Sequence, residues 1–561
     1  MIKFNRDDAI LANVARVIEK RAKTELELTL VLDKSMGENE SRLEDGVIYG
    51  GSYPEILYVA GRLLRNPETP DQSFVSHKPI CGLYWATHNQ GYSEAAPLEE
   101  MYEDMEDQAL WGMNTIMFWI DLAQHKISES GDYVARLLSL MKHAKSLGLK
   151  LAMNTIANEA PNDSTESLRA DWTSGHDGYT RTLGAHYHRE ICPSKPGGIA
   201  KILEYRREML EAFKEADLNY VCLFPYDQGG CTCPECAPWG GNGYVKCAEA
   251  LIPLYKEYFP NISIILSTWY FGHFRLGDVS EFQLLKGAIE SGRLKDAEYI
   301  LNEPQFGAYS FEHPLGRPMI SFPEISMNGI FPWGGYGATP LPRKIQKLWD
   351  AYGDSLQGGF PYCEGFYEDI NKIITLRQFR DNQTATDTVR EYLAYEFSLD
   401  GELLDEVHTA VMAMEETHAR TWEPGHRYPI SKPSKIFDIE KAILKAHETL
   451  DDVTKNSKKW RLLYYRAVID ASLARNDFYR DEKVLRLFRE MIELYHLQSA
   501  NFFVRPDDMI TEKYGRPLTK EEKIGSKYSV YAYSLSAAVF GVEPARILSK
   551  NALKSVFSPI S

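Results

Sequence analysis

Three cysteines, Cys231, Cys233 and Cys236, lie within six residues in the segment CTCPEC. Thiolates at this spacing can bind a zinc ion, but three ligands leave a closed tetrahedral site one ligand short. Cys192 in the segment EICPSKP is the best fourth ligand, and Cys247 is the second choice. The pattern predicts a structural zinc ion, with free reduced thiols as the alternative. A catalytic zinc is disfavoured, because such sites generally include His or carboxylate ligands and keep one position open.

Three acidic residues each follow a short apolar segment and are the candidates for catalysis. They are Asp227 in LFPYDQGGC, Glu324 in SFPEIS and Glu364 in PYCEGF. Hydrolysis of a glycosidic bond needs one protonated carboxyl for the leaving oxygen and one charged group that supports or attacks the cationic sugar carbon. Unlike surroundings can push the pKa values of such carboxyls apart. For each acid the alternative is a structural role in capping or in a turn.

Large aromatic and polar residues recur at the ends of the apolar segments. The candidates for substrate binding are His88, Asn89, Asp121, Asn154, Trp269, Tyr270, Glu303, Trp333 and Tyr362. Aromatic rings stack on the apolar faces of sugars, and carboxylates and amides bond to sugar hydroxyls. This mixture predicts a carbohydrate ligand. For His88 the alternative is a structural imidazole, and for Glu303, which precedes Pro304, it is a turn.

The elements that must position these residues are short apolar strands that alternate with amphipathic helices, as in parallel βα units. The predicted strands are Ile80–Ala86, Thr115–Asp121, Lys150–Asn154, Tyr220–Pro225, Ser263–Thr268, Tyr299–Asn302, Met319–Pro323 and Gly358–Tyr362. Eight such strands predict a (β/α)8 TIM barrel, in which the candidate residues meet at the carboxyl ends of the strands. The zinc ion would tie together the two long loops that flank the fourth strand. A doubly wound sheet is the rival, but it needs a glycine-rich phosphate turn where this chain has WATHNQGYSEAAP.

Three parts are predicted along the chain, and the fold class is α/β. Residues 1–76 form a small α/β domain, residues 77–382 the (β/α)8 catalytic barrel, and residues 383–561 an α-helical domain. In the first part we expect a helix at Asp7–Lys23 and a strand at Leu26–Leu32, with a linker around Pro67 and Pro70. The helices predicted in the last part are Thr386–Phe397, Glu402–Arg420, Ile439–Asn456, Lys459–Arg475 and Glu482–Ser499.

Composition and charge narrow the classes of partner. The chain has 561 residues, with 63 Lys and Arg against 79 Asp and Glu and a net charge of −16. Without a basic patch, this charge disfavours nucleic acid and anionic lipid as partners.

Asp7 and Asp8 lie where a signal peptide would begin its apolar core, and no run of apolar residues is long enough for a membrane helix. We therefore expect a cytoplasmic protein, and the aromatic-rich helical domain makes a homodimer plausible.

The segments IYGGSYPEILYVAGRLLR, CPSKP and DQGGCTCPEC resemble those of known enzymes. The first is similar to the small α/β domain that precedes the barrel in glycoside hydrolase families 20, 67 and 84, and the others resemble proteins related to family 163. The resemblance implies a glycosidase, often one acting on N-acetylhexosamine residues through the acetamide oxygen of the substrate. That mechanism usually requires two adjacent acidic or amide residues after strand four. Here Asp227 is followed by Gln228, so the pair is incomplete, and an acid pair formed with Glu324 or Glu364, as in α-glucuronidases, is the alternative.

These observations predict hydrolysis of a terminal sugar, with a β-N-acetylhexosaminide as the leading substrate. Asp227 would give the proton to the leaving oxygen, and Glu364 or Glu324 would supply the opposing charge. No catalytic cofactor is expected. The alternatives are another exo-glycosidase such as an α-glucuronidase, and a carbohydrate-binding barrel without catalysis. A lyase or isomerase is disfavoured, because neither a His-carboxylate metal site nor a lysine at a strand end is visible.

Overall fold

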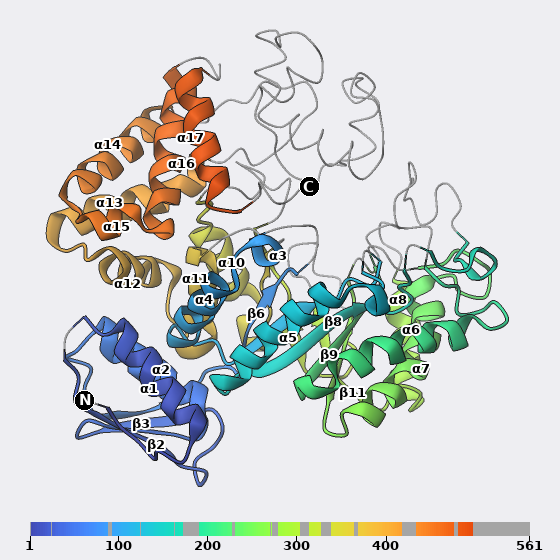
Figure 1. Ribbon diagram of the computed structural model, residues 1–561. Coiled ribbons are helices and arrows are strands. Elements are labelled where there is room, and N and C mark those ends of the chain that lie inside the picture. The colour runs from blue at the N-terminus through green and yellow to red at the C-terminus, as the bar shows by residue number, and fades with distance from the viewer. Residues whose placement is uncertain are drawn as a thin grey trace.

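The structure is a computed structural model. It describes residues 2–23, 25–87, 92–123, 125–161, 163–171, 190–226, 230–269, 271, 279–302, 314–326, 338–363, 369–417, 433–475 and 481–496. Its elements form a small sheet with two helices, a parallel barrel and a set of C-terminal helices (Figure 1).

The N-terminal sheet has five strands in the order β1-β2-β4-β3-β5. The strands are β1 (Ile2–Lys3), β2 (Leu28–Leu32), β3 (Glu40–Glu44), β4 (Val47–Gly50) and β5 (Gln72–Val75). Helices α1 (Ala9–Arg21) and α2 (Tyr53–Arg65) cover one face of this sheet (Figure 1). The segment predicted as a linker leads into β5, which pairs with β3. This short edge strand was not predicted, because its sequence QSFV has no clear alternation of apolar and polar residues.

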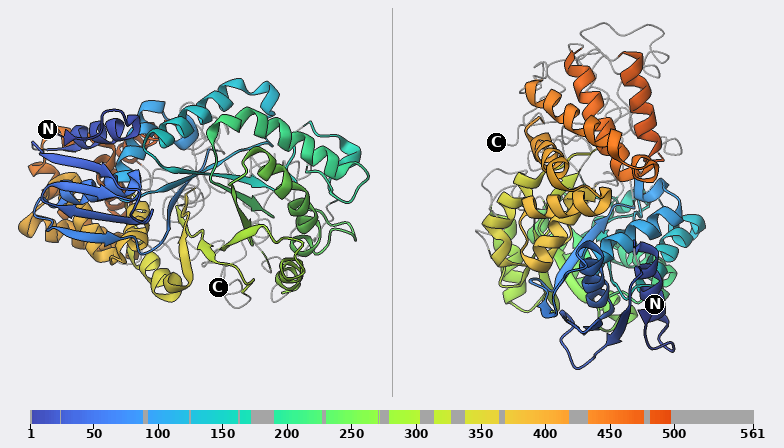
Figure 2. Two further views of the ribbon diagram at one scale, coloured as in Figure 1. Left: turned by 90° about the horizontal axis from the view of Figure 1, so that it is seen from below. Right: turned by 90° about the vertical axis from the view of Figure 1, so that its left-hand side faces the viewer.

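Eight parallel strands close into a barrel, in the order β10-β11-β12-β14-β6-β7-β8-β9. They are β6 (Ile80–Trp85), β7 (Thr115–Trp119), β8 (Lys150–Ile156), β9 (Tyr220–Phe224), β10 (Ser263–Ser267), β11 (Ala297–Asn302), β12 (Met319–Ser321) and β14 (Leu356–Gly359). The helices of the barrel region are α3 (Tyr92–Ala95), α4 (Leu98–Leu110), α5 (Gly131–Ser146), α6 (Gly198–Phe213), α7 (Gly243–Tyr258), α8 (Ser280–Glu290), α10 (Pro342–Tyr352) and α11 (Asp369–Asp381). Figure 2 shows the strands enclosed by helices. The predicted (β/α)8 barrel is thus confirmed, and each predicted strand overlaps an observed one.

The eighth barrel strand ends earlier than predicted. It stops at Gly359, and the chain then passes Pro361, which cannot donate a ladder hydrogen bond. A two-stranded parallel pair follows beyond the barrel, formed by β13 (Glu324–Ser326) and β15 (Tyr362–Cys363). Gly358 has a φ of +114°, and a Cβ there would lie 1.7 Å from the carbonyl oxygen of Ile80. Only glycine allows this close approach between β14 and β6.

The described part of the C-terminal region is helical. Its helices are α12 (Ala385–Phe397), α13 (Gly401–Met414), α14 (Pro433–Thr449), α15 (Asp452–Asn456), α16 (Lys458–Arg475) and α17 (Glu482–Glu493). The single helix predicted at Ile439–Asn456 is two helices, because the side chain of Asp451 accepts the Thr454 backbone N–H and starts α15. These helices project from one side of the barrel (Figure 1, Figure 2).

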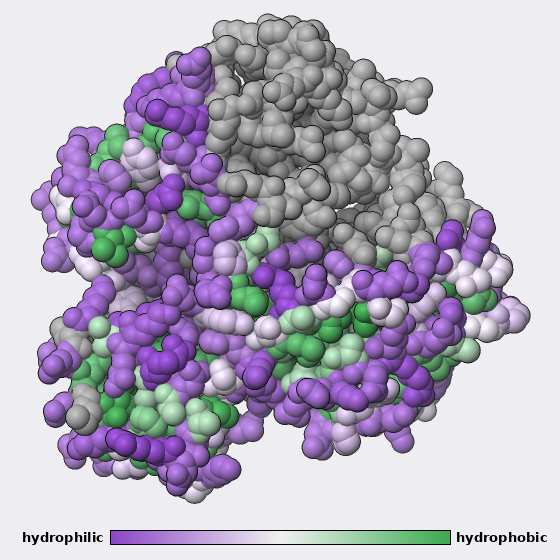
Figure 3. Space-filling view, in the orientation of Figure 1, coloured by the Kyte–Doolittle hydropathy of each residue, from purple (hydrophilic) through white to green (hydrophobic). Residues whose placement is uncertain are grey.

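Polar and charged side chains dominate the described surface in Figure 3. Among the helices of the described ranges, none combines the length and the hydropathy needed to cross a membrane.

Candidate active site

An aromatic layer fills the barrel interior at the carboxyl ends of the strands. Its members are Tyr84, Trp119, Phe224, Trp269, Phe322 and Tyr362. The ring centroid of Phe322, which follows β12, lies 5.2 Å from that of Tyr84 and 5.3 Å from that of Phe224. Because two strands separate β9 from β12, Phe224 and Phe322 can meet only through the barrel interior. The layer therefore forms a floor at the rim where barrel enzymes bind their substrates.

Two predicted sugar-binding residues, Trp269 and Tyr362, belong to this aromatic layer. Their ring centroids lie 5.9 Å apart, and Tyr362 stacks on Tyr84 at 5.3 Å. Tyr362 is only half-buried, so part of its surface remains available for contact. The other four members were not predicted from the sequence. The available signal was their position, since each lies within one residue of the end of a barrel strand.

Two carboxyl side chains lie close together beyond β7 and β8. Asp121, a predicted site residue, follows β7 and is buried, and Glu159 lies three residues beyond β8 and is 2% exposed. Glu159 Oε1 accepts the backbone N–H of Ala123 at 3.2 Å, whereas Oε2 has no hydrogen-bond partner among the described residues. Burial and the nearby charge of Asp121 raise the pKa of Glu159 to about 8. A carboxyl of this kind holds a proton at neutral pH and is suited to donate it.

Asn154, also predicted for substrate binding, lies on β8 and is fully buried. Its backbone is in register with Trp119 of the aromatic layer. Neither its amide nitrogen nor its amide oxygen has a hydrogen-bond partner among the described residues. An unpaired buried amide is costly, so this side chain is suited to bind a group that carries both a donor and an acceptor.

Glu324, one of the three predicted catalytic acids, lies on β13 opposite Tyr362 of β15. It is 5% exposed. Lys344 on α10 donates from Nζ to the Glu324 carbonyl oxygen at 3.3 Å. Burial lowers the pKa of Lys344, while the carboxylates of Glu324 and Glu415 oppose this shift. Lys344 thus brings an amine that can carry a positive charge next to Glu324.

The remaining predicted site residues lie outside the described residues. They are Asp227, Glu364, His88, Asn89, Tyr270, Glu303 and Trp333. The residues that flank Asp227 are described. The Tyr226 hydroxyl donates to Glu281 Oε1 at 2.7 Å, and the backbone N–H of Gly230 donates to the side-chain oxygen of Asn158 at 3.0 Å.

The structure brings together the four cysteines chosen as metal ligands. The sulfur of Cys192 lies 3.8 Å from that of Cys233 and 3.8 Å from that of Cys236. Together with Cys231, the four sulfur atoms lie within 4.8 Å of one another. Thiolates bound at about 2.3 Å around a tetrahedral zinc would be roughly 3.8 Å apart. This cluster could hold a metal ion, and Cys247, the second choice, lies on α7 outside it.

Polar groups around the four cysteines suit a cluster of thiolates. The backbone N–H of Asp171 donates to the Cys231 sulfur at 3.3 Å, and the Ser194 hydroxyl lies 3.1 Å from the Cys236 sulfur. Lys246 Nζ donates to the Ser194 hydroxyl oxygen at 2.7 Å, so the Ser194 proton is available for the sulfur. Such outer contacts orient metal-binding thiolates and stabilise their charge.

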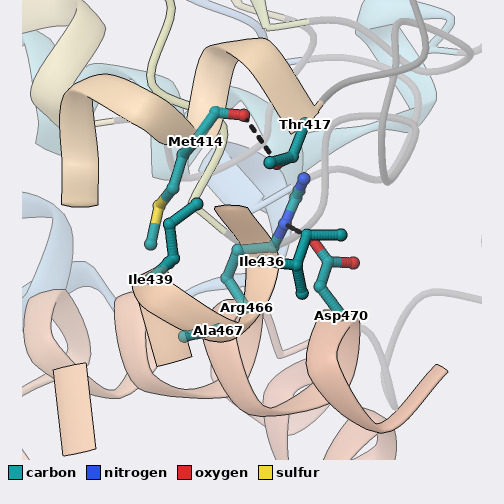
Figure 4. Close-up of a pocket in the computed structure, with 7 residues that line it drawn as sticks. All are labelled: Met414, Thr417, Ile436, Ile439, Arg466, Ala467 and Asp470. Carbon is teal, nitrogen blue, oxygen red and sulfur yellow. Dashed lines mark hydrogen bonds and ion pairs between the residues drawn. The ribbon is translucent and has the colours of Figure 1, made fainter. Parts of the chain in front are cut away.

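The C-terminal helices contact the segment that precedes α10. Arg466 on α16 donates from Nη1 to the Ala338 carbonyl oxygen at 3.5 Å. In a small hollow next to this contact, Arg466 pairs with Asp470 at 2.5 Å and Thr417 bonds to the Met414 carbonyl (Figure 4). The hollow is lined by Met414, Thr417, Ile436, Ile439, Arg466, Ala467 and Asp470. The helical region thereby supports Ala338, four residues before α10.

No protein-family model matches the sequence, and no curated protein matches it. Solved structures do match the fold. A family 89 glycoside hydrolase from Clostridium perfringens, in complex with 2-acetamido-1,2-dideoxynojirmycin, has a TM-score of 0.58 and 12% identity over 94% of this chain and 69% of that chain. The complex of a family 89 enzyme from the same organism with its substrate GlcNAc-alpha-1,4-galactose has a TM-score of 0.58 and 12% identity, over 96% and 70% of the two chains.

A family 138 glycoside hydrolase that targets pectin rhamnogalacturonan II has a TM-score of 0.55 and 10% identity over 97% of this chain and 80% of that chain. At these identities the likeness shows the fold. The chain thus shares its architecture with barrel glycoside hydrolases, which confirms the predicted fold class and, at the level of fold, the resemblance found in the sequence.

Proposed function

We propose that the protein is a glycoside hydrolase that releases a terminal sugar from an oligosaccharide or glycoconjugate. The observation that carries this proposal is the aromatic layer at the mouth of a closed barrel, with the buried carboxyls of Asp121, Glu159 and Glu324 beside strand ends of the same rim. Aromatic rings fit the apolar faces of a sugar, and carboxyls fit its hydroxyls and its glycosidic oxygen. Residues 1–76, 77–382 and 383–561 are proposed as three domains, with the site in the second.

The proposed roles of the acids are those predicted from the sequence. Asp227 donates a proton to the leaving oxygen. Glu324 supplies the opposing negative charge, supported by the position of Lys344, and Glu364 is the alternative for this role. The proposed sugar-binding residues are His88, Asn89, Asp121, Asn154, Trp269, Tyr270, Glu303, Trp333 and Tyr362.

An N-acetylhexosaminide is the proposed substrate class. The paired donor and acceptor of the Asn154 amide would complement the N–H and carbonyl of an acetamido group. The two family 89 complexes support this choice, because each contains an N-acetylated sugar or its analogue. The β-anomer, as in the substrate predicted from the sequence, is the first candidate, and the α-linked ligand of the family 89 enzyme makes the α-anomer the second.

Aryl glycosides of both anomers, with N-acetylhexosamine and glucuronic acid as sugars, test the proposal. Asp227→Asn is expected to lower kcat by about 10²–10⁴-fold on a 4-methylphenyl glycoside and much less on a dinitrophenyl glycoside, whose leaving group needs no proton. Glu324→Gln is expected to lower kcat on both substrates, because it removes the opposing charge. Glu38→Gln, at an exposed ion pair with Lys150, is the control.

Equal turnover by the wild type, Asp227→Asn and Glu324→Gln would refute the assignment of these acids. A sugar that raises Tm while no glycoside is consumed would instead support the alternative, a carbohydrate-binding barrel without catalysis.

Zinc is the proposed occupant of the four-cysteine cluster, in a structural role. The sulfur separations and the N–H and O–H groups directed at the sulfurs support this assignment. Four thiolates leave no open position for a substrate, so the proposed ion takes no part in the chemical step.

A further inference from the structure

One side chain connects the end of β8 to both loops that carry the cysteines. Asn158 lies two residues beyond β8 and is fully buried. Its Nδ2 donates to the carbonyl oxygens of Ile191 and Gly230, each at 3.0 Å. Its Oδ1 accepts the Gly230 N–H at 3.0 Å, and its own carbonyl accepts the Ile191 N–H at 3.0 Å. Asn158 therefore holds Ile191 and Gly230 by two hydrogen bonds each.

Ile191 and Gly230 occupy equivalent places in the two loops. Ile191 directly precedes Cys192, and Gly230 directly precedes Cys231. The loops are joined twice, once at Asn158 and once at the cluster of sulfurs. A third segment connects them further, because the Cys192 N–H donates to the Leu168 carbonyl at 2.9 Å and the Thr232 N–H donates to the Asp171 carbonyl at 2.5 Å.

These contacts lie close in sequence to two acidic residues at the rim of the barrel. Asn158 directly precedes Glu159, whose carboxyl faces the charge of Asp121. Gly230 follows Asp227 by three residues in the sequence. A shift at the cysteine cluster would therefore be transmitted through Asn158 to the carboxyl ends of β8 and β9, where small displacements cost catalytic rate.

We propose that Asn158 is a positioning residue, and that it and the metal-bound cysteines together form a clamp that fixes the two rim loops for catalysis. The proposal rests on the proposed glycosidase function and on zinc as the occupant. Metal content then controls the rate although the metal touches no substrate. Loss of contacts just outside a metal site typically lowers metal affinity or activity by about 10–100-fold.

The experiment compares the zinc-loaded wild type, the wild type stripped with a chelator, Asn158→Ala and Asn114→Ala. Asn114 is the matched control, because its side-chain amide also bonds to the backbone twice. Its Oδ1 accepts the Cys81 N–H at 2.9 Å and its Nδ2 donates to the Pro79 carbonyl at 3.0 Å, at the opposite end of the barrel. Zinc affinity, kcat and KM are measured for each protein. Backbone amide exchange is measured in residues 190–195 and 230–236, with β7 as the internal reference.

We expect Asn158→Ala to bind zinc about 10–100-fold more weakly and to lose about tenfold or more in kcat, with KM within about threefold of the wild type. Saturating zinc should restore part of the rate. Stripping zinc from the wild type should speed amide exchange at least about tenfold in the two loops and leave β7 unchanged. Asn114→Ala should lower Tm while its zinc affinity and kcat stay near those of the wild type.

The proposal is overturned if Asn158→Ala binds zinc as tightly as the wild type, or if zinc removal leaves exchange in both loops unchanged. Equal losses of kcat in Asn158→Ala and Asn114→Ala would also overturn it, because they would indicate general destabilisation. If the wild type hydrolyses no glycoside, the proposed function fails, while zinc affinity and amide exchange still test the clamp.

Discussion

Glu159 shows how its surroundings alter a single acidic residue. Its side chain is almost completely buried beside Asp121, and these surroundings raise its pKa to about 8. In the unfolded chain the carboxyl returns to an ordinary pKa near 4.5. Between these two values the folded state keeps a proton that the unfolded state has lost. This carboxyl therefore lowers the free energy of unfolding progressively as the pH rises from about 4.5 to about 8, by at most ~1.4 kcal/mol per pH unit.

Glu159→Gln tests whether this carboxyl lowers the free energy of unfolding as the pH rises. Glutamine stays neutral at every pH, so the variant should gain stability relative to the wild type as the pH is raised from 5 to 8. Urea unfolding at three pH values measures the difference. Glu38→Gln, at an exposed carboxylate, should show no such trend. Parallel stability curves for Glu159→Gln and the wild type would contradict the raised pKa.

The same residue marks a limit of prediction from sequence. Asp121 and Asn154 were selected because they end predicted strands, and the structure places both of them buried at ends of strands on the rim side. Glu159 was missed because the third strand was predicted to end at Asn154, whereas β8 continues to Ile156. Its raised pKa depends on burial and on Asp121, which is 38 positions earlier, so no local pattern could reveal it.

At the scale of elements, α10 depends on a residue from the C-terminal helical region. Glu415, which follows α13, accepts the backbone N–H of Arg343 at 2.7 Å and that of Lys344 at 2.9 Å. A carboxylate at this end of a helix satisfies unpaired N–H groups and complements the helix dipole. Because α10 carries Lys344, this contact also supports the lysine beside Glu324.

Glu415→Ala should therefore lower the free energy of unfolding by about 1–2 kcal/mol. It should also speed amide exchange in the first turn of α10. Glu416→Gln is the matched control, since Glu416 contacts the side chains of Arg343 and Lys435 and not the helix backbone. Equal effects of the two substitutions would show that the backbone contacts of Glu415 stabilise α10 no more than the side-chain contacts of Glu416 do.

At the scale of the whole molecule, buried charges fasten the N-terminal sheet and its helices to the barrel. Arg380 on α11 pairs with Glu55 on α2, and both side chains are almost fully buried. Arg380 also donates to the Gly112 carbonyl at 2.7 Å. Lys459 on α16 pairs with Glu396 on α12 at 2.8 Å and with Asp107 on α4 at 3.3 Å. All three parts of the molecule are thus joined by ion pairs in protected positions.

Removal of one partner should be costly, because the other charge stays buried without compensation. We expect Glu55→Ala to lower the free energy of unfolding by about 3–5 kcal/mol. Chemical denaturation followed by fluorescence measures this loss. The exposed pair of Glu38 and Lys150 provides the comparison, and Glu38→Gln should change stability little. A small effect of Glu55→Ala would show that the first domain is held by apolar contacts instead.

The sequence by itself determined the barrel, because each strand is a short apolar run with turn or helix signals on both sides, and this pattern is local. It also selected Cys192 as the fourth cysteine, through its place in the loop segment EICPSKP before the fourth strand. Only the tertiary structure decided which side chains meet. The aromatic layer, the Asp121 and Glu159 pair, the position of Lys344 by Glu324 and the four contacts of Asn158 join residues from separate strands and loops. Such contacts arise when the barrel closes, and sequence spacing does not encode the distances between its strand ends.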